Sequence, residues 1–352
     1  MPTDQRSCAD RLLVSIATLL LAVTFGCHKP ATHSSTAEAT GNGGSEPTEI
    51  TLALNWFPDA QHGGFYAADV NGHFAAAGLM AEITPGGPAA PVLQNVALGR
   101  VDFGVANADQ VLMARAQGMP IVAVFAAMQS SPRCILVHRE AGIESLEKLH
   151  DVTLALGAGK AFAEYLQKSY TWENVTVVPY TGSITPFLAD DHYAQQGYVF
   201  SEPFFARQQG VDPIVLMVSD AGFNPYTSCI VVNEDLIRSS PERVRKFVRA
   251  VQQGWADYLD SPGDVNQRIH DANPQADLAS LQFGVEALRP LCSPNNLPTT
   301  ELGTMSRERW QQLNEQLSQL GLLGSEVATD EAFTNEFVEE PGASDLVLET
   351  SN

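Results

Sequence analysis

The sequence has little positive charge. It contains 20 lysine and arginine residues against 41 aspartate and glutamate residues, so its 352 residues carry a formal net charge of -21. Because such a surface repels phosphate backbones and anionic lipid, we expect no nucleic-acid partner. The remaining composition, with 44% hydrophobic and 17% charged residues, is that of an ordinary globular protein long enough for two lobes.

Cysteine is scarce, and neither cysteine nor histidine occurs at a spacing that suggests a metal site. Two of the five cysteines lie near the N-terminus, which leaves an odd number in the body of the chain: Cys134, Cys229 and Cys292. Two interpretations remain open. Two of the three cysteines form a disulfide, or all three are buried thiols that pack as small hydrophobic groups. The eight histidines are scattered, so we expect no metal and no cofactor.

Long hydrophobic runs are missing beyond the N-terminus. The run "LLVSIATLLLAVTFG" is too short for a comfortable membrane span but fits the apolar part of a signal peptide, which we place at residues 1–26. The pair Gly26-Cys27 resembles the lipobox of bacterial lipoproteins, in which the cysteine is lipidated. We therefore expect an exported protein that Cys27 anchors at the periplasmic face of a bacterial membrane. An ordinary cleaved signal is the alternative.

Two further segments have the composition of solvated chain. Residues 27–49 are rich in Ser, Thr, Gly and Pro without periodicity, which predicts a flexible linker. Residues 325–352 contain eight acidic and no basic side chains. We expect an acidic tail over 339–352.

Between these ends, strand-like and helix-like segments alternate, which predicts an α/β fold with mostly parallel sheets flanked by helices. The expected strands are 50–56, 81–87, 101–107, 121–128, 134–139, 152–157, 175–180 and 197–202. The expected helices are 60–76, 90–98, 108–118, one that opens at Pro203, and, in the more helical last third, 241–260 and 306–321.

Polar or aromatic residues occupy five of the corners where an expected strand gives way to a helix. In open parallel sheets, ligands bind beyond the carboxyl ends of the strands, where helix N-termini present free N–H groups. A single such corner is more often only a cap or a tight turn. Together they favour a small planar polar ligand: Asn55-Trp56, Asn107, Gly157-Ala158-Gly159, Tyr180-Thr181-Gly182-Ser183 and Ser201-Glu202-Pro203.

Two stretches carry a family resemblance. "ALNWFPDAQHGGFYAADVNGHFAAAGL" and "GRVDFGVANADQVLMARAQGMPIVAVFA" resemble the substrate-binding proteins of ABC importers for thiamine-pyrimidine precursors, whose branch is also similar to taurine, sulfonate and nitrate receptors. The same domain occurs in thiamine-pyrimidine synthases. The resemblance covers about residues 50–338. Asp59 stands where Asn is common in this family, and Gly63 stands where Ala is common.

The resemblance implies a two-lobed periplasmic-binding-protein type II fold that closes on its ligand. Lobe one would comprise 50–131 plus 226–338, and lobe two 132–225. The implied ligand-binding residues are Asn55, Trp56, His62, Tyr66, Asn107, Tyr180, Thr181, Glu202 and Tyr226. Trp56 and Tyr66 would stack on a ring, and Glu202 would accept from an amine or a protonated ring nitrogen. We assign the remaining aromatics of the first stretch, Phe57, Phe65 and Phe74, to core packing.

The expected function is capture of a small heterocycle, foremost a thiamine-pyrimidine precursor, and its delivery to an ABC permease by a monomer without enzymatic activity. A flavin-like ring, taurine, a sulfonate or nitrate is an alternative ligand. A synthase of the same domain family is the enzymatic alternative; it would use pyridoxal phosphate on a lysine and consume a histidine. Against it, no lysine lies between Lys29 and Lys148. A sensory or adhesive surface protein is a third class.

Overall fold

The computed structural model describes residues 46–294, 298–325 and 327–338. The predicted signal peptide, Cys27, nearly all of the linker and the tail over 339–352 lie outside the described residues. Within the described ranges, no helix is both long and apolar enough to cross a membrane.

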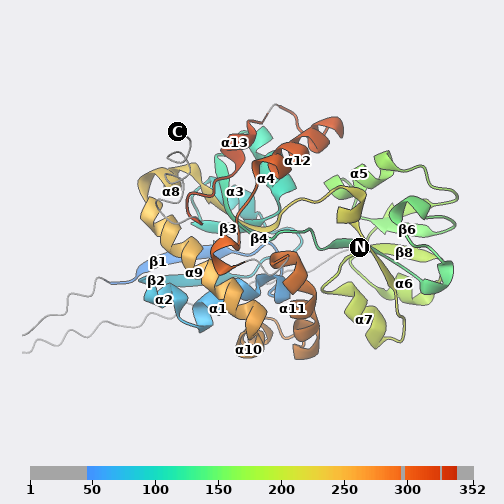
Figure 1. The fold of residues 1–352 in the computed structure, drawn as a ribbon, viewed down its shortest axis with the longest axis horizontal. Helices are drawn as coiled ribbons and strands as arrows, with labels where there is room; N and C mark the ends of the chain where they lie inside the picture. Colours follow the sequence, from blue (N-terminus) through green and yellow to red (C-terminus); the bar gives the residue numbers. More distant parts are fainter. Residues whose placement is uncertain (1–45, 295–297, 326, 339–352) are drawn as a thin grey trace, which may run out of the picture. The chain divides into compact units, whose positions relative to one another are not determined.

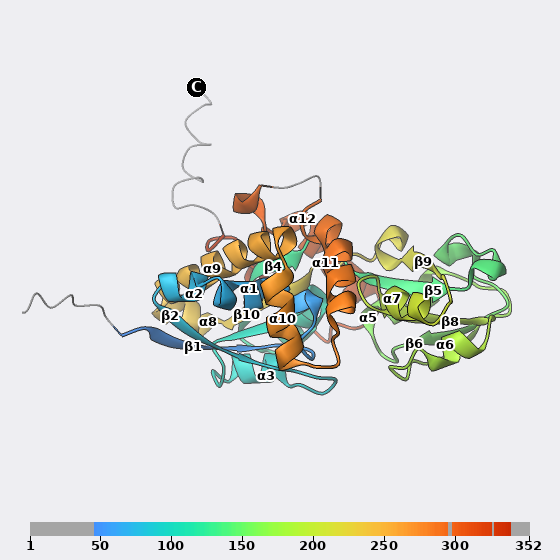
Figure 2. The same cartoon turned by 90° about the horizontal axis from the view of Figure 1, so that it is seen from below.

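The first sheet joins four strands from the start of the described chain to β10, which follows the second sheet in sequence; the strand order is β2-β1-β3-β10-β4 (Figure 1 and Figure 2). Its strands are β1 (Thr48–Ala53), β2 (Leu79–Thr84), β3 (Phe103–Ala106), β4 (Ile121–Met128) and β10 (Thr227–Asn233). β1 pairs in parallel with β2 and β3, whereas β10 is antiparallel to β3 and β4. The sheet is therefore mixed, because the returning strand β10 is inserted into it. We call the half built on this sheet lobe one.

The second sheet has the same plan, in the order β7-β6-β8-β5-β9. Its strands are β5 (Arg133–Val137), β6 (Thr153–Leu156), β7 (Thr176–Pro179), β8 (Tyr193–Tyr198) and β9 (Ile214–Met217). β6 pairs in parallel with β7 and β8, and β5 is antiparallel to β8 and β9. We call the half built on this sheet lobe two.

Helices cover both faces of each sheet. Lobe one carries α1 (Gly63–Val70), α2 (His73–Ala76), α3 (Val92–Ala97), α4 (Ala108–Ala116), α8 (Glu234–Ser239), α9 (Pro241–Asp260), α10 (Gly263–Ala272), α11 (Leu278–Cys292), α12 (Arg307–Gln319) and α13 (Thr329–Ala332). Lobe two carries α5 (Ala161–Ser169), α6 (Thr185–Ala189) and α7 (Glu202–Gln208). Short 3-10 turns are η1 (Ala60–His62), η2 (Arg139–Ala141), η3 (Leu146–Lys148), η4 (Val218–Ala221) and η5 (Thr299–Glu301).

Alternation along the strands of lobe one divides its core between the two faces of the sheet. Ile50 and Leu52 of β1 face the cluster formed with α1, α2, α9, α10 and α11. Ala53 faces a second cluster formed with α3, α4 and α12, which continues through β5 and β6 into lobe two. Since successive strand residues point to opposite faces, both faces of the sheet are buried.

The long helix α9 is the central support of lobe one. Its apolar residues recur at helical spacing and form the buried face, which includes Val244, Phe247, Val248, Val251 and Trp255. In both views α9 lies along α1 and α2 (Figure 1 and Figure 2).

Glycines allow α1 and α9 to approach closely. A Cβ added at Gly64 would lie 2.1 Å from the Trp255 ring, and one at Gly63 would lie 1.9 Å from the Tyr258 ring. From the other helix, a Cβ at Gly254 would lie 2.2 Å from the carbonyl oxygen of Gly64. The Gly pair in "NWFPDAQHGGFYAA" is therefore explained by helix packing.

The three cysteines of the described chain are buried free thiols. Cys134 lies in β5, Cys229 in β10 and Cys292 at the end of α11. Burial raises the pKa of each thiol, which keeps all three protonated. The sequence left a disulfide and packed thiols as alternatives, and the structure contains packed thiols.

We expect Gly64→Ala to lower the free energy of unfolding by about 1–3 kcal/mol, because the added methyl group overlaps the Trp255 ring in a packed core. Chemical denaturation monitored by circular dichroism measures the change. Gly263→Ala is the matched control, since a Cβ there meets nothing within 4 Å. A Gly64→Ala protein as stable as the control variant would contradict the packing explanation.

Candidate functional site

The end of β1 turns into α1 through a short capped segment. Asp59 has extended backbone angles and its carboxylate accepts a hydrogen bond from the backbone N–H of Ala60 at 2.7 Å, which caps η1. The carbonyl oxygen of the preceding Pro58 accepts from the Asn273 side chain at 2.8 Å. These contacts fix the direction in which the chain leaves the sheet, and with it the side chains of residues 55–57.

His62 is fully buried and holds Asn55. Its Nε2 lies 3.0 Å from Oδ1 of Asn55. Because that oxygen only accepts, Nε2 carries the hydrogen and Nδ1 is an acceptor, which has no hydrogen-bond partner among the described residues. Burial lowers the pKa of His62 to about 3, so the ring is neutral at physiological pH.

Trp56 and Phe57 form an exposed aromatic pair at the same strand end. Their side chains are 42% and 46% exposed, and their ring centroids lie 5.5 Å apart at an angle of 68°. The Phe57 ring sits over Gly87. Our assignment of Phe57 to the core is therefore wrong, because this residue lies beyond the end of β1. Phe65 and Phe74 are buried as predicted.

The two tyrosines expected in lobe one are packed away from solvent. Tyr66 is 1% exposed, lies within the core cluster beside α9, and has the Arg268 guanidinium 5.5 Å from its ring centroid. Tyr226 is 3% exposed, its hydroxyl accepts from the Ser306 N–H at 2.8 Å, and Arg309 covers its ring at 3.7 Å. Neither ring presents a free face for stacking in this structure.

Asn107 caps α4 from a half-buried position. Its backbone N–H donates to Oε1 of Gln110 at 3.0 Å, one half of a capping box. Its own Oδ1 takes the other half of the capping box, toward the backbone N–H of Gln110, without reaching strict hydrogen-bond geometry with a described residue. Oδ1 of Asp109 also has no hydrogen-bond partner among the described residues. Burial raises the pKa of Asp109, opposed by the positive charges of Arg133 and Lys160 in lobe two.

Lobe two contributes a carboxylate held by two donors. Glu202 is the first residue of α7, and its Oε2 accepts from the Tyr198 N–H at 2.7 Å. The Tyr180 hydroxyl donates to its Oε1 at 3.3 Å. Although the side chain is partly exposed, burial raises the pKa of Glu202, opposed by these donors and by Arg133. Sequence reasoning thus brings Tyr180 and Glu202 together correctly, while Thr181 lies exposed beside them.

Arg133 is the residue of this region that sequence reasoning missed. Its guanidinium lies 3.9 Å from the Tyr198 ring centroid and 4.7 Å from that of Phe162. Within the part of the chain that the structure describes, it forms no ion pair, so the two rings hold it beside Glu202. The signal that could have found it is its position: Arg133 is a cation between the predicted start of lobe two at 132 and the predicted strand 134–139.

A turn of lobe two packs into lobe one next to Asp59. Phe200 is 3% exposed and belongs to the core cluster of lobe one. A Cβ added at Gly284 of α11 would meet both Ala60, at 2.6 Å, and the carbonyl oxygen of Phe200, at 3.5 Å. Asp59 precedes Ala60 and Glu202 follows Phe200 by two residues, so this contact brings the two carboxyl groups toward each other. Burial raises the pKa of Asp59 to about 6, with a contribution from Glu202 in the same direction.

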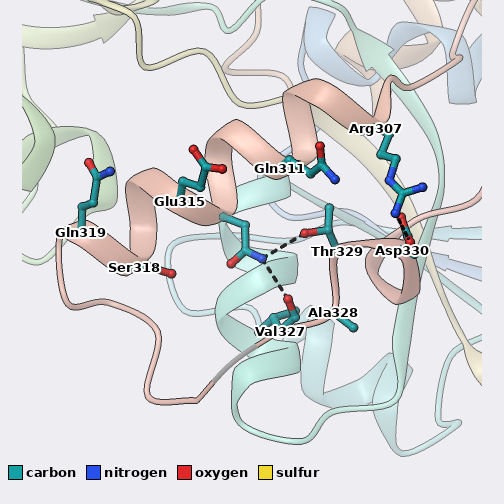
Figure 3. Close-up of a pocket in the computed structure, with 10 residues that line it drawn as sticks. Arg307, Gln311, Glu315, Ser318, Gln319, Val327, Ala328, Thr329 and Asp330 are labelled. Carbon is teal, nitrogen blue, oxygen red and sulfur yellow. Dashed lines mark hydrogen bonds and ion pairs between the residues drawn. The ribbon is translucent and has the colours of Figure 1, made fainter.

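Two hollows lie along α12, away from these strand ends. One has a volume of about 570 Å³ and is lined mainly by polar side chains of α12 and by residues 327–330 (Figure 3). Many of these groups bond one another, as Asn314 does with Val327 and Thr329. The other, of about 290 Å³, lies between α12 and the segment 219–224. Neither lining includes an aromatic side chain, whereas the strand ends described above do offer exposed rings.

We expect Asp59→Asn to stabilise the protein at pH 8 by about 1–2 kcal/mol and to have little effect at pH 4. The folded protein favours the protonated Asp59, so ionisation lowers stability as the pH rises from about 4 to about 6, and the full cost applies above that range. Asn still accepts from the Ala60 N–H, which preserves the cap.

Urea denaturation of both proteins at pH 4 and pH 8 measures this difference. Glu82→Gln, at an exposed position in β2, controls for removal of one negative charge. Equal destabilisation of Asp59→Asn at the two pH values would mean that capping outweighs the buried charge.

Comparison with known proteins agrees with this architecture. The family described as NMT1/THI5-like matches residues 59–265, more than half of the chain. The riboflavin-binding protein RibY of Chloroflexus aurantiacus is 30% identical over 95% of this chain and 98% of its own. A formylaminopyrimidine-binding protein of Halalkalibacterium halodurans is 24% identical over 91% and 98%.

Synthases and sulfonate receptors also match. The 4-amino-5-hydroxymethyl-2-methylpyrimidine phosphate synthase THI5 of Saccharomyces cerevisiae is 24% identical over 67% of this chain and 75% of its own. The periplasmic aliphatic sulphonate-binding protein SsuA of Escherichia coli superimposes with a TM-score of 0.63 at 12% identity, over 81% of this chain and 91% of that chain. The chain therefore belongs to the NMT1/THI5-like family and has the fold of the periplasmic binding proteins.

Proposed function

We propose that this protein captures a small, flat nitrogen heterocycle between its two lobes and delivers it to an ABC importer. Trp56 would supply the stacking face from lobe one, and Glu202, held by Tyr180, would supply the directed acceptor from lobe two. The observation that carries the proposal is this pairing of an exposed indole with a positioned carboxylate on opposite lobes of a binding-protein fold.

The ligand class follows from what these two groups recognise. An indole face contributes about 0.5–1.5 kcal/mol to a stacked aromatic ring, whichever ring it is. A carboxylate selects ligands that offer an N–H donor or a protonated nitrogen, and such a bond contributes about 1.5–3 kcal/mol. Aminopyrimidines and flavins both carry a pyrimidine-type ring, and the names of two binding-protein relatives support this class. We put a thiamine-pyrimidine precursor first and a flavin second.

Asn55 and Asn107 complete the proposed site on lobe one. Asn55 is held by the buried His62, which would orient its amide toward a ring stacked on Trp56. The buried Oδ1 of Asn107 offers a further acceptor for a ligand N–H. Thr181 would lie at the rim of lobe two. We leave Tyr66 and Tyr226 out of the stacking surface because both rings are enclosed by the protein.

The importer role implies a position outside the cytoplasmic membrane and a permease partner. The fold, and the periplasmic location named for the sulphonate-binding neighbour, support an exported protein. We propose that a single copy of the chain, tethered by a lipid on Cys27 and the linker over 27–49, would meet its permease at the membrane surface.

The synthase reaction receives less support from the described residues. His62 is fully buried and its Nε2 is engaged by Asn55. Lys160 lies near enough to Asp109 to lower the pKa of that carboxyl. It is exposed at the start of α5 in lobe two, whereas His62 lies in lobe one, so the lysine and the histidine are on different lobes. The binding-protein relatives also match a larger share of this chain than the yeast synthase does.

Glu202→Gln should weaken binding of an aminopyrimidine or riboflavin by about tenfold to a hundredfold, because it keeps the shape of the acceptor but removes its charge. Stability should not fall, since burial already disfavours the charged form. Trp56→Ala should weaken the same ligands through lost stacking and leave a sulfonate or nitrate little affected. Isothermal titration calorimetry with each ligand measures both effects.

Glu140→Gln is the matched control for charge, because Glu140 is exposed in η2. If riboflavin and the aminopyrimidine bind the parent protein and Glu202→Gln with equal affinity, Glu202 is not the acceptor. If neither ligand binds the parent protein while a sulfonate does, the ligand class is wrong.

Cys27→Ala should move the protein from the membrane fraction to the soluble fraction, because acyl chains on that cysteine would supply the membrane affinity. Fractionation followed by immunoblotting measures the distribution, and Cys8→Ala is the control. Full retention of Cys27→Ala in the membrane fraction would exclude a lipid anchor at this position.

A further inference from the structure

Two carboxyl groups, Asp59 and Glu202, lie on either side of a contact between the lobes. Asp59 caps η1 in lobe one, and Glu202 opens α7 in lobe two. The turn before Glu202 buries Phe200 in the core cluster of lobe one, against the segment that begins at Ala60. The packing of Phe200, and not only electrostatics, therefore places Asp59 and Glu202 on the two sides of one junction.

Further contacts join the two lobes beside this junction. Phe204 of α7 lies 5.5 Å from Phe283 of α11, ring centroid to ring centroid, and Arg207 lies 5.9 Å from the same Phe283 ring. These contacts and the burial of Phe200 join α7 of lobe two to α11 of lobe one. Separation of the lobes would withdraw Phe200 and Glu202 together, because only one residue lies between them.

The hydrogen bonds of the two carboxyl groups are unequal. Glu202 accepts from the Tyr198 N–H and the Tyr180 hydroxyl. Asp59 accepts from the Ala60 N–H through Oδ1, and its side chain has no ion pair with a described residue. The negative charge of Asp59 is therefore stabilised by fewer hydrogen-bond donors than the charge of Glu202.

The other titratable groups that face the pair do not cancel its charge. They are Arg133 and Cys134 of β5, Tyr180 after β7, and Tyr258 of α9. Arg207, over the Phe283 ring, is already paired with Asp212. Burial raises the pKa of Cys134, Tyr180 and Tyr258, so all three are neutral. The charge of Arg133 is shared between Glu202 and Asp109, which leaves a net negative junction.

We propose that Asp59 makes closure of the lobes depend on charge: it opposes closure on an empty or anionic site and permits closure on a ligand that brings an N–H donor or a positive charge to the junction. Like charges brought together in a partly desolvated contact repel strongly, and a donor or cation between them reverses the sign. Rejection of the wrong ligand by an unpaired charge is a recognised route to specificity. The ligand half of this inference rests on the proposed function, whereas the closure half does not.

Small-angle scattering of the ligand-free mature chain, made soluble with Cys27→Ala, tests closure without any ligand. We expect the parent's radius of gyration to fall as the pH is lowered from 8 to 5, because protonation removes the charge of Asp59, whose pKa burial raises to about 6. Asp59→Asn should already be compact at pH 8 and change little with pH. Glu202→Gln should shift in the same direction, and Glu82→Gln, at an exposed site in β2, should follow the parent.

Ligand selectivity is the second arm, with ethanesulfonate as the anionic probe. Asp59→Asn should bind ethanesulfonate at least about tenfold more tightly than the parent does, because the repelling charge is gone. An Asp59→Asn protein that follows the parent in radius of gyration at both pH values, or that binds ethanesulfonate no more tightly, overturns the inference. Failure of riboflavin and the aminopyrimidine to bind the parent would count against the proposed function, while the scattering result would still decide the role of Asp59.

Discussion

The close approach of α1 to α9 is the constraint on which the lobe-one side of the site depends. Gly63, Gly64 and Gly254 remove the side chains that would hold the two helices apart, and Trp255 and Tyr258 fill the space. Because α1 follows η1 without a break, this packing also fixes the segment that carries Asp59 and His62. The strand end with Trp56 can then be polar and exposed, because the helices behind it supply the stability.

The two lobes contribute different kinds of groups to the candidate site. Lobe one presents ring faces and amides: Trp56 and Phe57 are exposed, and His62 holds Asn55. Lobe two presents charge: Glu202 is fixed by Tyr198 and Tyr180, and Arg133 is held between aromatic rings. A ligand that needs both stacking and a charged partner can therefore be held fully only when the lobes are together.

Much of the fold could be predicted from the sequence, because its segments are strongly patterned. The helices over 241–260 and 306–321 appear as α9 and α12 within two residues at either end. The expected strands do not include the antiparallel strand β10, because its run "TSCIVVN" directly follows the expected boundary between the lobes at 225/226. The strand expected over 197–202 is β8, which spans Tyr193–Tyr198; the buried Gln195 and Gln196 conceal its strand character in the sequence.

The candidate site was predictable in outline only. Tyr180 and Glu202 could be paired because both lie at strand ends of one sheet, where side chains converge. The burial of Tyr66 and Tyr226 and the exposure of Phe57 depend on which neighbouring helix covers each ring, and a sequence pattern does not contain that information. Asp59 and Glu202 are more than a hundred residues apart in the sequence, and their proximity depends on a contact between the lobes that no local pattern reveals.

The buried, neutral His62 has a consequence for how the site would respond to acid. Histidine is the side chain that ordinarily changes charge between pH 5 and 8, and receptors that unload in acidic surroundings commonly use it. Here the imidazole has its pKa lowered to about 3 and its Nε2 committed to Asn55. Among the residues assigned to the site, the groups that respond to mild acid are therefore carboxyl groups. On protonation a carboxylate loses negative charge, whereas an imidazole would gain positive charge. Mild acidification would thus relieve repulsion at the junction between the lobes instead of creating it.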